Sequence, residues 1–179
     1  MGRKILCLII PSLQAGGMER VMSELAGYFC RKPEIEVHLV LYGKSTDIFY
    51  NVPDSLIIHK PKTNFNDRFR QAYTLGRLFY LRQTIKKINP DSILSFGEYW
   101  NSFVLLSMSG LHYPIYISDR CSPEKEFSVL HSLLRKWLYP KAQGIIAQTE
   151  KAKLEYNSKF KHNNYSVIGN PGVVIPDSG

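Results

Sequence analysis

The stretch Lys4-Ile5-Leu6-Cys7-Leu8-Ile9-Ile10, followed shortly by Ala15-Gly16-Gly17-Met18-Glu19-Arg20, decides the fold. The apolar run predicts a buried strand, and the glycines join it to a helix that begins near Met18. Glycine has no Cβ, so the backbone can turn sharply and approach a ligand, while the first N–H groups of the helix point outward. Such a junction favours phosphate, although two glycines at this place often form only a tight turn.

The rest of the chain alternates short apolar runs with segments of helical spacing. Six further strands are predicted at 37–42, 56–59, 92–96, 113–118, 144–148 and 165–168, and further helices at 68–88, 103–108 and 130–139. Short apolar strands alternating with helices indicate a mostly parallel sheet covered on both faces. We therefore expect an α/β, doubly wound, Rossmann-like domain with about seven strands.

Length, composition and charge narrow the class of protein. The 179 residues, 44% of them hydrophobic, fit one domain, and the formal charge of +8 favours phosphates, anionic membranes or nucleic acid as partners. The three cysteines and five histidines lack the spacing of a disulfide framework or a metal site, so neither metal nor cofactor is expected. No apolar run approaches the roughly 20 residues that span a bilayer. A cytoplasmic protein is the simplest interpretation.

In doubly wound sheets, ligands bind where the chain leaves the carboxyl ends of the strands. Four segments of this chain leave predicted strands with polar residues: Ser12 to Met18, Phe96 to Asn101, Asp119 to Pro123, and Thr149-Glu150. These segments are the candidate site.

Several motifs of the chain, taken as an ordered set, resemble the N-terminal domain of GT-B fold glycosyltransferases, in particular the retaining enzymes of glycosyltransferase family 4. The matching segments are Ile9-Ile10-Pro11-Ser12-Leu13, Gly16-Gly17-Met18-Glu19-Arg20, Asn89-Pro90-Asp91, Ser118-Asp119-Arg120, Ala147-Gln148-Thr149-Glu150 and Ile168-Gly169-Asn170-Pro171. Their order and spacing match over nearly the whole chain.

The resemblance implies two Rossmann-like domains that bind different substrates. The N-terminal domain holds the acceptor, and the C-terminal domain holds most of a nucleotide-diphosphate sugar donor. Only the first half is matched, so we expect residues 1–172 to form the acceptor-side domain and 173–179 to begin an interdomain linker. The chain is then a truncation that is nearly inactive alone. It belongs to an enzyme that transfers a sugar to a cell-surface or lipid-linked glycan without a metal.

The resemblance also suggests roles for the residues near the donor. Gly16 and Gly17 let the backbone approach the donor diphosphate and sugar, and Arg20 is a further diphosphate ligand or a solvated surface arginine. Asp119 and Arg120 occupy the exit of the fifth strand, where many relatives present a histidine. Asp119 could orient or deprotonate an acceptor hydroxyl and Arg120 could bind a phosphate, or the two form an ion pair.

Acceptor contacts are expected from polar and aromatic residues on two of the loops. A carboxylate, two aromatic rings and an amide on one loop suit stacking on a sugar and hydrogen bonding to its hydroxyls, although the tryptophan could equally pack in the core. The predicted acceptor-binding residues are Glu98, Tyr99, Trp100, Asn101, Thr149 and Glu150.

The third candidate partner is an anionic membrane surface. The segment from Arg68 to Lys87 has no acidic residue and interleaves aromatic residues with six basic ones: Arg68, Arg70, Arg77, Arg82, Lys86 and Lys87. This composition fits a peripheral location at the cytoplasmic face of a membrane, with a solvated positive face as the alternative. A second group, Arg135-Lys136-Trp137 through Lys141, could extend it. No nucleic-acid-binding motif is found.

A different class of function also fits these observations. The chain could be a non-catalytic Rossmann-like binding module that docks to a membrane surface or to a second chain supplying the donor site. A stop codon after Gly179 would favour this alternative.

Overall fold

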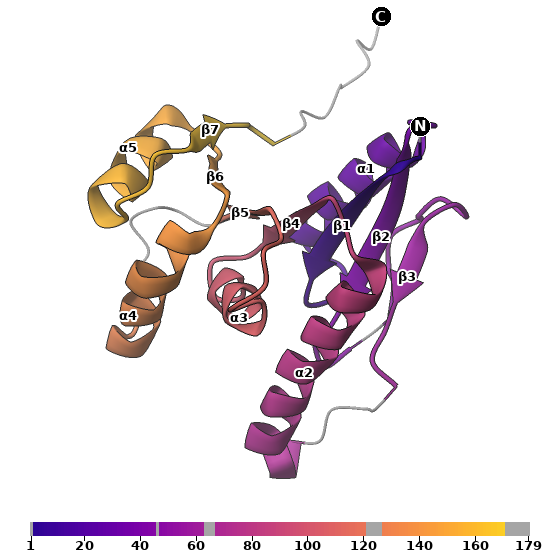
Figure 1. The fold of residues 1–179 in the computed structure, drawn as a ribbon, viewed down its shortest axis with the longest axis horizontal. Helices are drawn as coiled ribbons and strands as arrows, with labels where there is room; N and C mark the ends of the chain where they lie inside the picture. The colour runs from indigo at the N-terminus through magenta and orange to yellow at the C-terminus, as the bar shows by residue number, and fades with distance from the viewer. Residues whose placement is uncertain (1, 46, 63–66, 121–126, 171–179) are drawn as a thin grey trace, which may run out of the picture.

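The computed structural model describes residues 2–45, 47–62, 67–120 and 127–170. Seven strands form one sheet in the order β3-β2-β1-β4-β5-β6-β7, and every neighbouring pair is parallel (Figure 1). The strands are β1 (Lys4–Ile10), β2 (Ile35–Leu41), β3 (Ile57–His59), β4 (Ser92–Phe96), β5 (Ile115–Ser118), β6 (Gly144–Ala147) and β7 (Tyr165–Val167). The predicted doubly wound α/β fold is confirmed.

Helices connect these strands in nearly strict alternation. They are α1 (Gly17–Cys30), α2 (Arg70–Ile88), α3 (Asn101–Ser107), α4 (Val129–Leu138) and α5 (Glu150–Lys159), with 3₁₀ turns η1 (Asp67–Phe69) and η2 (Tyr139–Lys141). The predicted linker at 173–179 lies outside the described residues.

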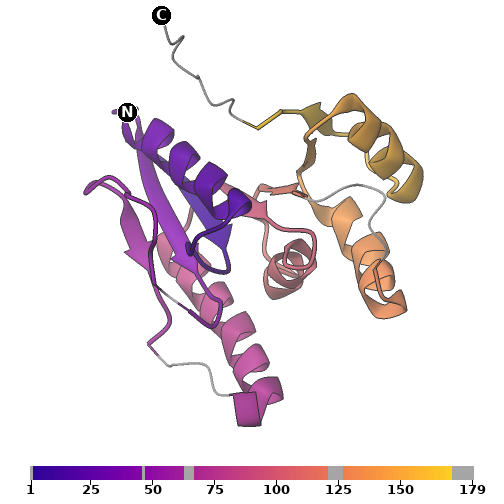
Figure 2. The ribbon, with the colours of Figure 1, turned by 180° about the vertical axis from the view of Figure 1, so that it is seen from behind.

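The two faces of the sheet have separate cores. Helix α1 covers one face (Figure 2), where Val21, Met22 and Ala26 pack in a cluster with Leu8 and Leu39. The other face is covered by α2, α3, α4 and α5, whose buried residues share a second cluster with Cys7 and Ile9 of β1. Alternate residues of β1 thus serve opposite cores, as expected for a strand buried on both sides.

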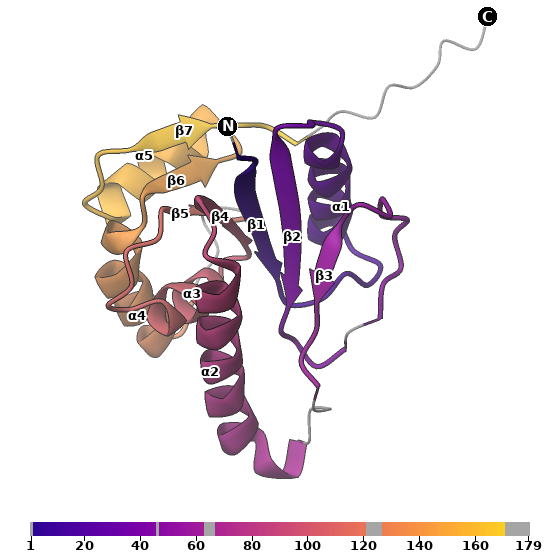
Figure 3. The same ribbon diagram turned by 45° about the vertical axis from the view of Figure 1, so that its right-hand side comes forward.

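Helix α2 packs on the sheet only through its C-terminal half. Leu81, Ile85 and Ile88 are buried, whereas Leu75, which the sequence places on the same apolar stripe, is 57% exposed. The N-terminal half extends beyond the strands (Figure 3), so there is no sheet for Leu75 to cover. The helix ends at Asn89, which adopts the left-handed conformation typical of a helix C-terminus.

Helix α5 is absent from the prediction. Only two of its residues, Ala152 and Tyr156, are buried, so an apolar stripe is too short to reveal it. The signal lies instead at its start, where the Thr149 hydroxyl accepts a hydrogen bond from the Ala152 N–H at 3.1 Å. Thr149 followed by an acidic residue is a typical helix N-terminus.

The order of the strands places the ligand-binding edge. From β1 the chain passes through α1 to β2 on one side, and from β4 it passes through α3 to β5 on the other. Neighbouring β1 and β4 therefore send their connections in opposite directions, which opens a crevice between their carboxyl ends. The glycine loop before α1 and the loop before α3 both leave the sheet at this point.

A chain of polar side chains links β2 and β3 at the sheet edge. His38 Nε2 lies 2.8 Å from Glu36 Oε1, and His38 Nδ1 lies 2.9 Å from Nε2 of His59. Only one proton fits between the two ring nitrogens, because two facing N–H groups would repel each other. Burial lowers the pKa of His59, and the charges of His38 and Lys87 lower it further.

This arrangement predicts that acid weakens the fold at β3. Below the ordinary histidine pKa of 6.5 the unfolded chain binds a proton at His59 that the folded chain does not, so the free energy of unfolding falls as the pH drops. Urea titrations at pH 7 and pH 5 should give a lower midpoint at pH 5. His59→Asn should reduce this difference, and His112→Asn, at an exposed histidine, should leave it unchanged. An unaltered difference in His59→Asn would contradict the assignment.

Candidate functional site

The glycine loop is held open by hydrogen bonds to a tyrosine. The Gly16 N–H donates to the Tyr50 hydroxyl at 2.9 Å, and that hydroxyl donates to the Gly16 carbonyl at 2.7 Å. Gly16 has an extended backbone, with φ of 179°. A Cβ added at Gly17 would have no atom within 4 Å, so there is open space in front of the first helical residue. The loop therefore offers room to a ligand.

Two charged residues of the first helical turns modify this predicted anion site. The Glu19 carboxylate lies where a Cβ of Gly16 would be, so the side chain folds back over the helix start. Any anion at the glycines has to displace this carboxylate. Arg20, predicted to bind the diphosphate, points to the surface, where Nε lies 3.7 Å from Glu24 and 42% of the side chain is exposed.

The loop before α3 approaches the glycine loop closely. Gly97 has a φ of 111°, which disfavours other residues. A Cβ at this position would lie 3.0 Å from Cδ1 of Trp100 and 3.3 Å from the sulfur of Met18. The structure thus brings together two of the predicted segments, Ser12 to Met18 and Phe96 to Asn101, at the β1–β4 crevice.

Asp119, predicted as a catalytic residue, lies in the core instead of the crevice. It is 2% exposed, forms an ion pair with Arg135, and accepts hydrogen bonds from Tyr139 at 2.7 Å and Asn101 at 2.9 Å. Burial raises the pKa of Asp119, and contacts with Arg135, Tyr139 and Asn101 oppose that rise. Its ion-pair partner is therefore Arg135 and not the neighbouring Arg120. The carboxylate is positioned to join β5 to α3 and α4.

Asn101, predicted to bind the acceptor, belongs to the same buried network. Its side chain is fully buried, its amide donates to Asp119, and its oxygen accepts a hydrogen bond from Ser95 at 2.8 Å. The amide therefore forms its hydrogen bonds within the protein, and the structure does not support the predicted acceptor contact. Glu98, Tyr99 and Trp100, which precede it, are partly or well exposed.

Arg120 connects the end of β5 to the last described residues. Its guanidinium lies 3.9 Å over the ring of Phe96, and Nη1 donates to the Asn170 side chain at 2.6 Å. Burial lowers the pKa of Arg120 to about 10, so the group stays positively charged at neutral pH. Residues 121–123 of this predicted segment lie outside the described part of the chain.

Thr149 and Glu150, also predicted to bind the acceptor, act locally. Thr149 caps α5, and Glu150 is 73% exposed and lies 3.7 Å from Lys153. Neither contributes to the cavities described below, as far as the described residues define them.

A cavity of about 340 Å³ lies beside the crevice, between the end of β2, the loop before α3, and helices α2 and α4. We call it the aromatic cavity; its lining residues are Tyr42, Gly43, Lys44, Arg70, Thr74, Arg77, Tyr99, Trp100, Phe103 and His131. Tyr42 stacks on Phe103 with centroids 5.6 Å apart and meets Trp100 edge-on at 6.0 Å. Tyr99 and Trp100, both predicted to bind the acceptor, contribute to its wall.

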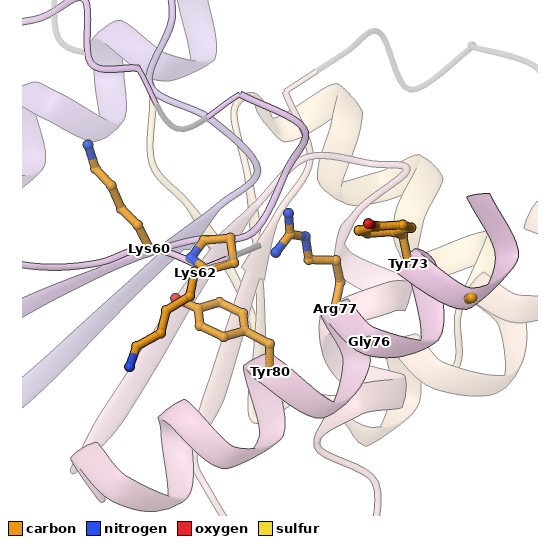
Figure 4. Close-up of a pocket in the computed structure, with 8 residues that line it drawn as sticks. Lys60, Lys62, Tyr73, Gly76, Arg77 and Tyr80 are labelled. Carbon is orange, nitrogen blue, oxygen red and sulfur yellow. The ribbon is translucent and has the colours of Figure 1, made fainter. Parts of the chain in front are cut away.

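A second cavity of about 620 Å³ lies across α2 and is formed by Lys60, Pro61, Lys62, Ala72, Tyr73, Gly76, Arg77 and Tyr80. Figure 4 shows Arg77 rising from α2 between Tyr73 and Tyr80, opposite the segment that carries the two lysines. Arg77 lines both cavities and is 5% exposed. Sequence reasoning did not identify Tyr42, Lys44, Lys60 or Lys62, because their roles depend on where α2 crosses the sheet edge.

The predicted membrane-facing cations divide into two groups. Arg77 is buried, so it is not available to a membrane surface. Arg82 donates to the carbonyls of Ser107 and Ser109 at 3.0 and 2.8 Å and thereby joins α2 to the end of α3. Arg135 is likewise buried by its pairing with Asp119. The cations of α2 and η1 that remain exposed are Arg68, Arg70, Lys86 and Lys87.

Residues 15–171 match the family described as Glycosyltransferase Family 4. The chain belongs to this family. A curated relative from Campylobacter jejuni is 24% identical over 151 residues, which cover 82% of this chain and 41% of that protein. Its name is GalNAc-alpha-(1->4)-GalNAc-alpha-(1->3)-diNAcBac-PP-undecaprenol alpha-1,4-N-acetyl-D-galactosaminyltransferase.

Solved structures of GT-B proteins share the fold of the present chain. The lipopolysaccharide outer core galactosyltransferase WaaB in its apo form has a TM-score of 0.73 at 16% identity, covering 97% of this chain and 47% of that one. The Anabaena protein HepE in complex with UDP and glucose has a TM-score of 0.68 at 16% identity, covering 95% and 45%. The chain thus spans less than half the length of these relatives.

The described residues include neither a membrane-spanning helix nor a metal-binding cluster. No helix among them is long and apolar enough to cross a membrane. No group of three or more histidine, cysteine, aspartate or glutamate side chains among them is arranged to hold a metal ion.

The buried ion pair between Asp119 and Arg135 predicts that a conservative substitution at Asp119 strongly lowers the free energy of unfolding. Asp119→Asn keeps the shape of the side chain but leaves the Arg135 charge buried without its counter-ion, which should cost about 3–5 kcal/mol of unfolding free energy. Glu24→Gln, which breaks the exposed pair with Arg20, should cost at most about 1 kcal/mol. Chemical denaturation of both variants measures the difference. Equal costs would mean that the buried pair is not a structural element.

Proposed function

We propose that this chain is the acceptor-binding half of a retaining glycosyltransferase that uses a nucleotide-diphosphate sugar. The acceptor is a cell-surface or lipid-linked glycan. The observation that carries the proposal is the adjacency of the open glycine loop and the aromatic cavity at the β1–β4 crevice. Support comes from the family membership, from HepE, whose structure contains UDP and glucose, and from the Campylobacter relative, whose name specifies a lipid-diphosphate-linked acceptor.

The roles of the individual residues follow from their positions. Gly17 leaves room for the donor diphosphate and sugar, and the first N–H groups of α1 face that space. Tyr99 and Trp100 present ring surface to the acceptor, with Glu98 beside them. Arg120 keeps a positive charge at the end of β5, near the segment that leads toward a donor domain. No general base is assigned.

Most electrostatic stabilisation of the leaving diphosphate falls to the facing domain. The isolated chain should therefore fold but transfer almost no sugar. The gene sequence after the codon for Gly179 separates the two candidate functions. An open frame encoding a second α/β domain supports the transferase, whereas a stop codon favours a binding module that docks to a membrane or to a separate donor-binding chain.

Gly17→Ala tests the donor role of the glycine loop. The new methyl group meets nothing in this chain, so the unfolding free energy should be unchanged or rise by up to about 1 kcal/mol. In the two-domain protein the substitution should lower kcat/KM for the nucleotide sugar by on the order of tenfold or more, because the methyl occupies space needed by the donor. Gly27→Ala, within the same helix, is the matched control. Unchanged kinetics in Gly17→Ala would remove the donor role.

We further propose peripheral contact with an anionic membrane through α2 and α4. Both helices extend from the sheet on the same side in Figure 1. On α4, Leu130, Leu133 and Trp137 are 67%, 59% and 55% exposed, an unusual number of solvent-exposed apolar side chains for one short helix. The exposed cations of α2 and Lys136 and Lys141 near the end of α4 complement an anionic surface.

Vesicle co-sedimentation tests this contact. The chain should bind vesicles that contain phosphatidylglycerol more strongly than pure phosphatidylcholine vesicles. Arg68→Gln together with Arg70→Gln, at the end of α2 that extends beyond the strands, should weaken that binding by about fivefold per charge. Leu130→Ser with Leu133→Ser should also weaken it, whereas Leu154→Ser, at a leucine of α5 that is 69% exposed, should not. Equal binding to neutral and anionic vesicles would contradict the electrostatic part of the proposal.

A further inference from the structure

A hollow of about 480 Å³ opens directly beside the glycine loop. It is formed by the residues that precede Gly16 and by the loop that follows β2. We call it the loop hollow; its lining residues are Gln14, Ala15, Asp47, Ile48 and Phe49. Because Ala15 directly precedes Gly16, a ligand in the loop hollow lies next to the proposed site of transfer.

The ring of Phe49 gives the loop hollow a flat apolar surface. Phe49 is 68% exposed, although two contacts fix its position. Its N–H donates to the Leu13 carbonyl at 2.9 Å, and its ring meets the ring of Tyr50 edge-on, with centroids 5.2 Å apart. An aromatic ring that is both fixed and open suits stacking against the apolar face of a sugar ring.

The polar side chains of the loop hollow are held in place by Ser45. Its hydroxyl accepts a hydrogen bond from Nε2 of Gln14 at 3.1 Å and donates to Oδ2 of Asp47 at 3.0 Å. The Asp47 N–H donates to the same hydroxyl at 3.2 Å. The amide oxygen of Gln14 and Oδ1 of Asp47 take no part in these bonds, and both side chains belong to exposed residues. Two acceptor oxygens beside an aromatic ring suit the hydroxyl groups of a sugar, and their fixed positions lower the cost of binding.

The charges around the loop hollow favour an uncharged ligand. Asp47 is the one charged residue that lines it in the described part of the chain, so no lysine or arginine from that part contributes to its wall. A carboxylate repels a phosphate or a uronic acid placed beside it. This local preference holds although the whole chain has a formal charge of +8. The loop hollow therefore fits a hydroxyl-rich ligand without negative charge.

The loop after β2 connects the loop hollow to the aromatic cavity. Lys44 lines the aromatic cavity and Asp47 lines the loop hollow, and three residues of chain span at most about 11 Å. The Tyr50 hydroxyl, which is bound to Gly16, fixes the same loop to the glycine loop. Both surfaces are therefore within reach of one oligosaccharide.

We propose that the loop hollow is a second acceptor subsite that binds an uncharged sugar ring. The ring stacks on Phe49, and its hydroxyl groups donate hydrogen bonds to Gln14 and Asp47. This inference rests on the proposed function and adds to it a second point of contact, separate from Tyr99 and Trp100, together with a preference for uncharged sugars at that point.

Backbone amide chemical shifts of the full chain measure binding residue by residue. The probes are the methyl glycosides of glucose, galactose, N-acetylglucosamine and N-acetylgalactosamine. At least one of them should shift the amide signals of Ala15, Ile48 and Phe49 saturably. The expected Kd is on the order of 1 mM, because a small open subsite makes few contacts. Absence of a saturable shift at these amides with all four probes would overturn the proposal.

Substitutions at Phe49 test the stacking contact. Phe49→Leu keeps an apolar side chain and the backbone bond to Leu13 but removes the flat ring, so it should raise the Kd about fivefold. Phe49→Tyr keeps the ring and should bind like the unaltered chain. Phe79→Leu is the matched control, because Phe79 is 66% exposed on α2 and does not line the loop hollow. An unchanged Kd in Phe49→Leu, or an equal rise in the control, contradicts stacking on Phe49.

The charge preference is tested with methyl glucuronide, which differs from methyl glucoside by a carboxylate. The glucuronide should bind at least about fivefold more weakly than the glucoside, because its carboxylate lies near Asp47. Asp47→Asn should narrow this gap. Asp54→Asn, at an exposed aspartate outside the loop hollow, should leave it unchanged. Equal binding of the two glycosides to the unaltered chain would contradict the preference for uncharged sugars.

The subsite and the proposed function fail in different ways. If the methyl glycosides bind as expected and the reading frame stops after Gly179, the sugar site stands while the transferase proposal fails. If a second domain and sugar transfer are found but Phe49→Leu leaves the KM for the acceptor unchanged, the transferase stands and the subsite fails. A shift at the amides of Ile48 and Phe49 with UDP-glucose, but with none of the methyl glycosides, would assign the loop hollow to the donor and contradict an acceptor subsite.

Discussion

The buried ion pair between Asp119 and Arg135 is the contact on which the arrangement of the site depends. Asp119 directly follows β5, Arg135 lies on α4, and the same carboxylate accepts hydrogen bonds from Tyr139 and from Asn101 at the start of α3. One side chain thus fixes two helices to the carboxyl end of the sheet. Removing two charges from water is costly, so the pair favours a unique geometry more than it adds stability. That geometry sets where the loop carrying Trp100 meets the glycine loop.

The glycine loop differs from the buried ion pair, because its proposed role depends on open space in front of Gly17 and not on contacts. Space in front of Gly17 is open, and the Glu19 carboxylate covers part of the helix start. A neutral helix end would attract any anion, whereas this one requires an anion to compete with a tethered carboxylate. Under the function proposed above, the loop alone should bind an anion weakly, and tight binding should require the proposed donor domain.

Local pattern predicts the elements well and their mutual contacts poorly. The strand Ser92–Phe96 is predicted with the same bounds as in the structure, because Asp91 and Gly97 delimit the short segment Ser-Ile-Leu-Ser-Phe. Asp119 was predicted to face a ligand because it ends a strand, and nothing in the sequence places Arg135 and Tyr139 around it, 16 and 20 residues away. The burial of Arg77 could not be predicted either, because the sequence does not show where the sheet ends beneath α2.

The distribution of positive charge along α2 depends on where the sheet ends beneath this helix. The predicted helix at 68–88 has six basic residues and no acidic one, which suggests a uniform charged face, but the edge of the sheet divides it. Past that edge, Arg77 lies between two cavities, whereas Arg82 is fixed by carbonyls of the segment after α3. The positive charge of this stretch is therefore not one continuous surface. Arg68, Arg70, Lys86 and Lys87 are exposed to solvent, whereas Arg77 is buried and Arg82 is held by backbone carbonyls.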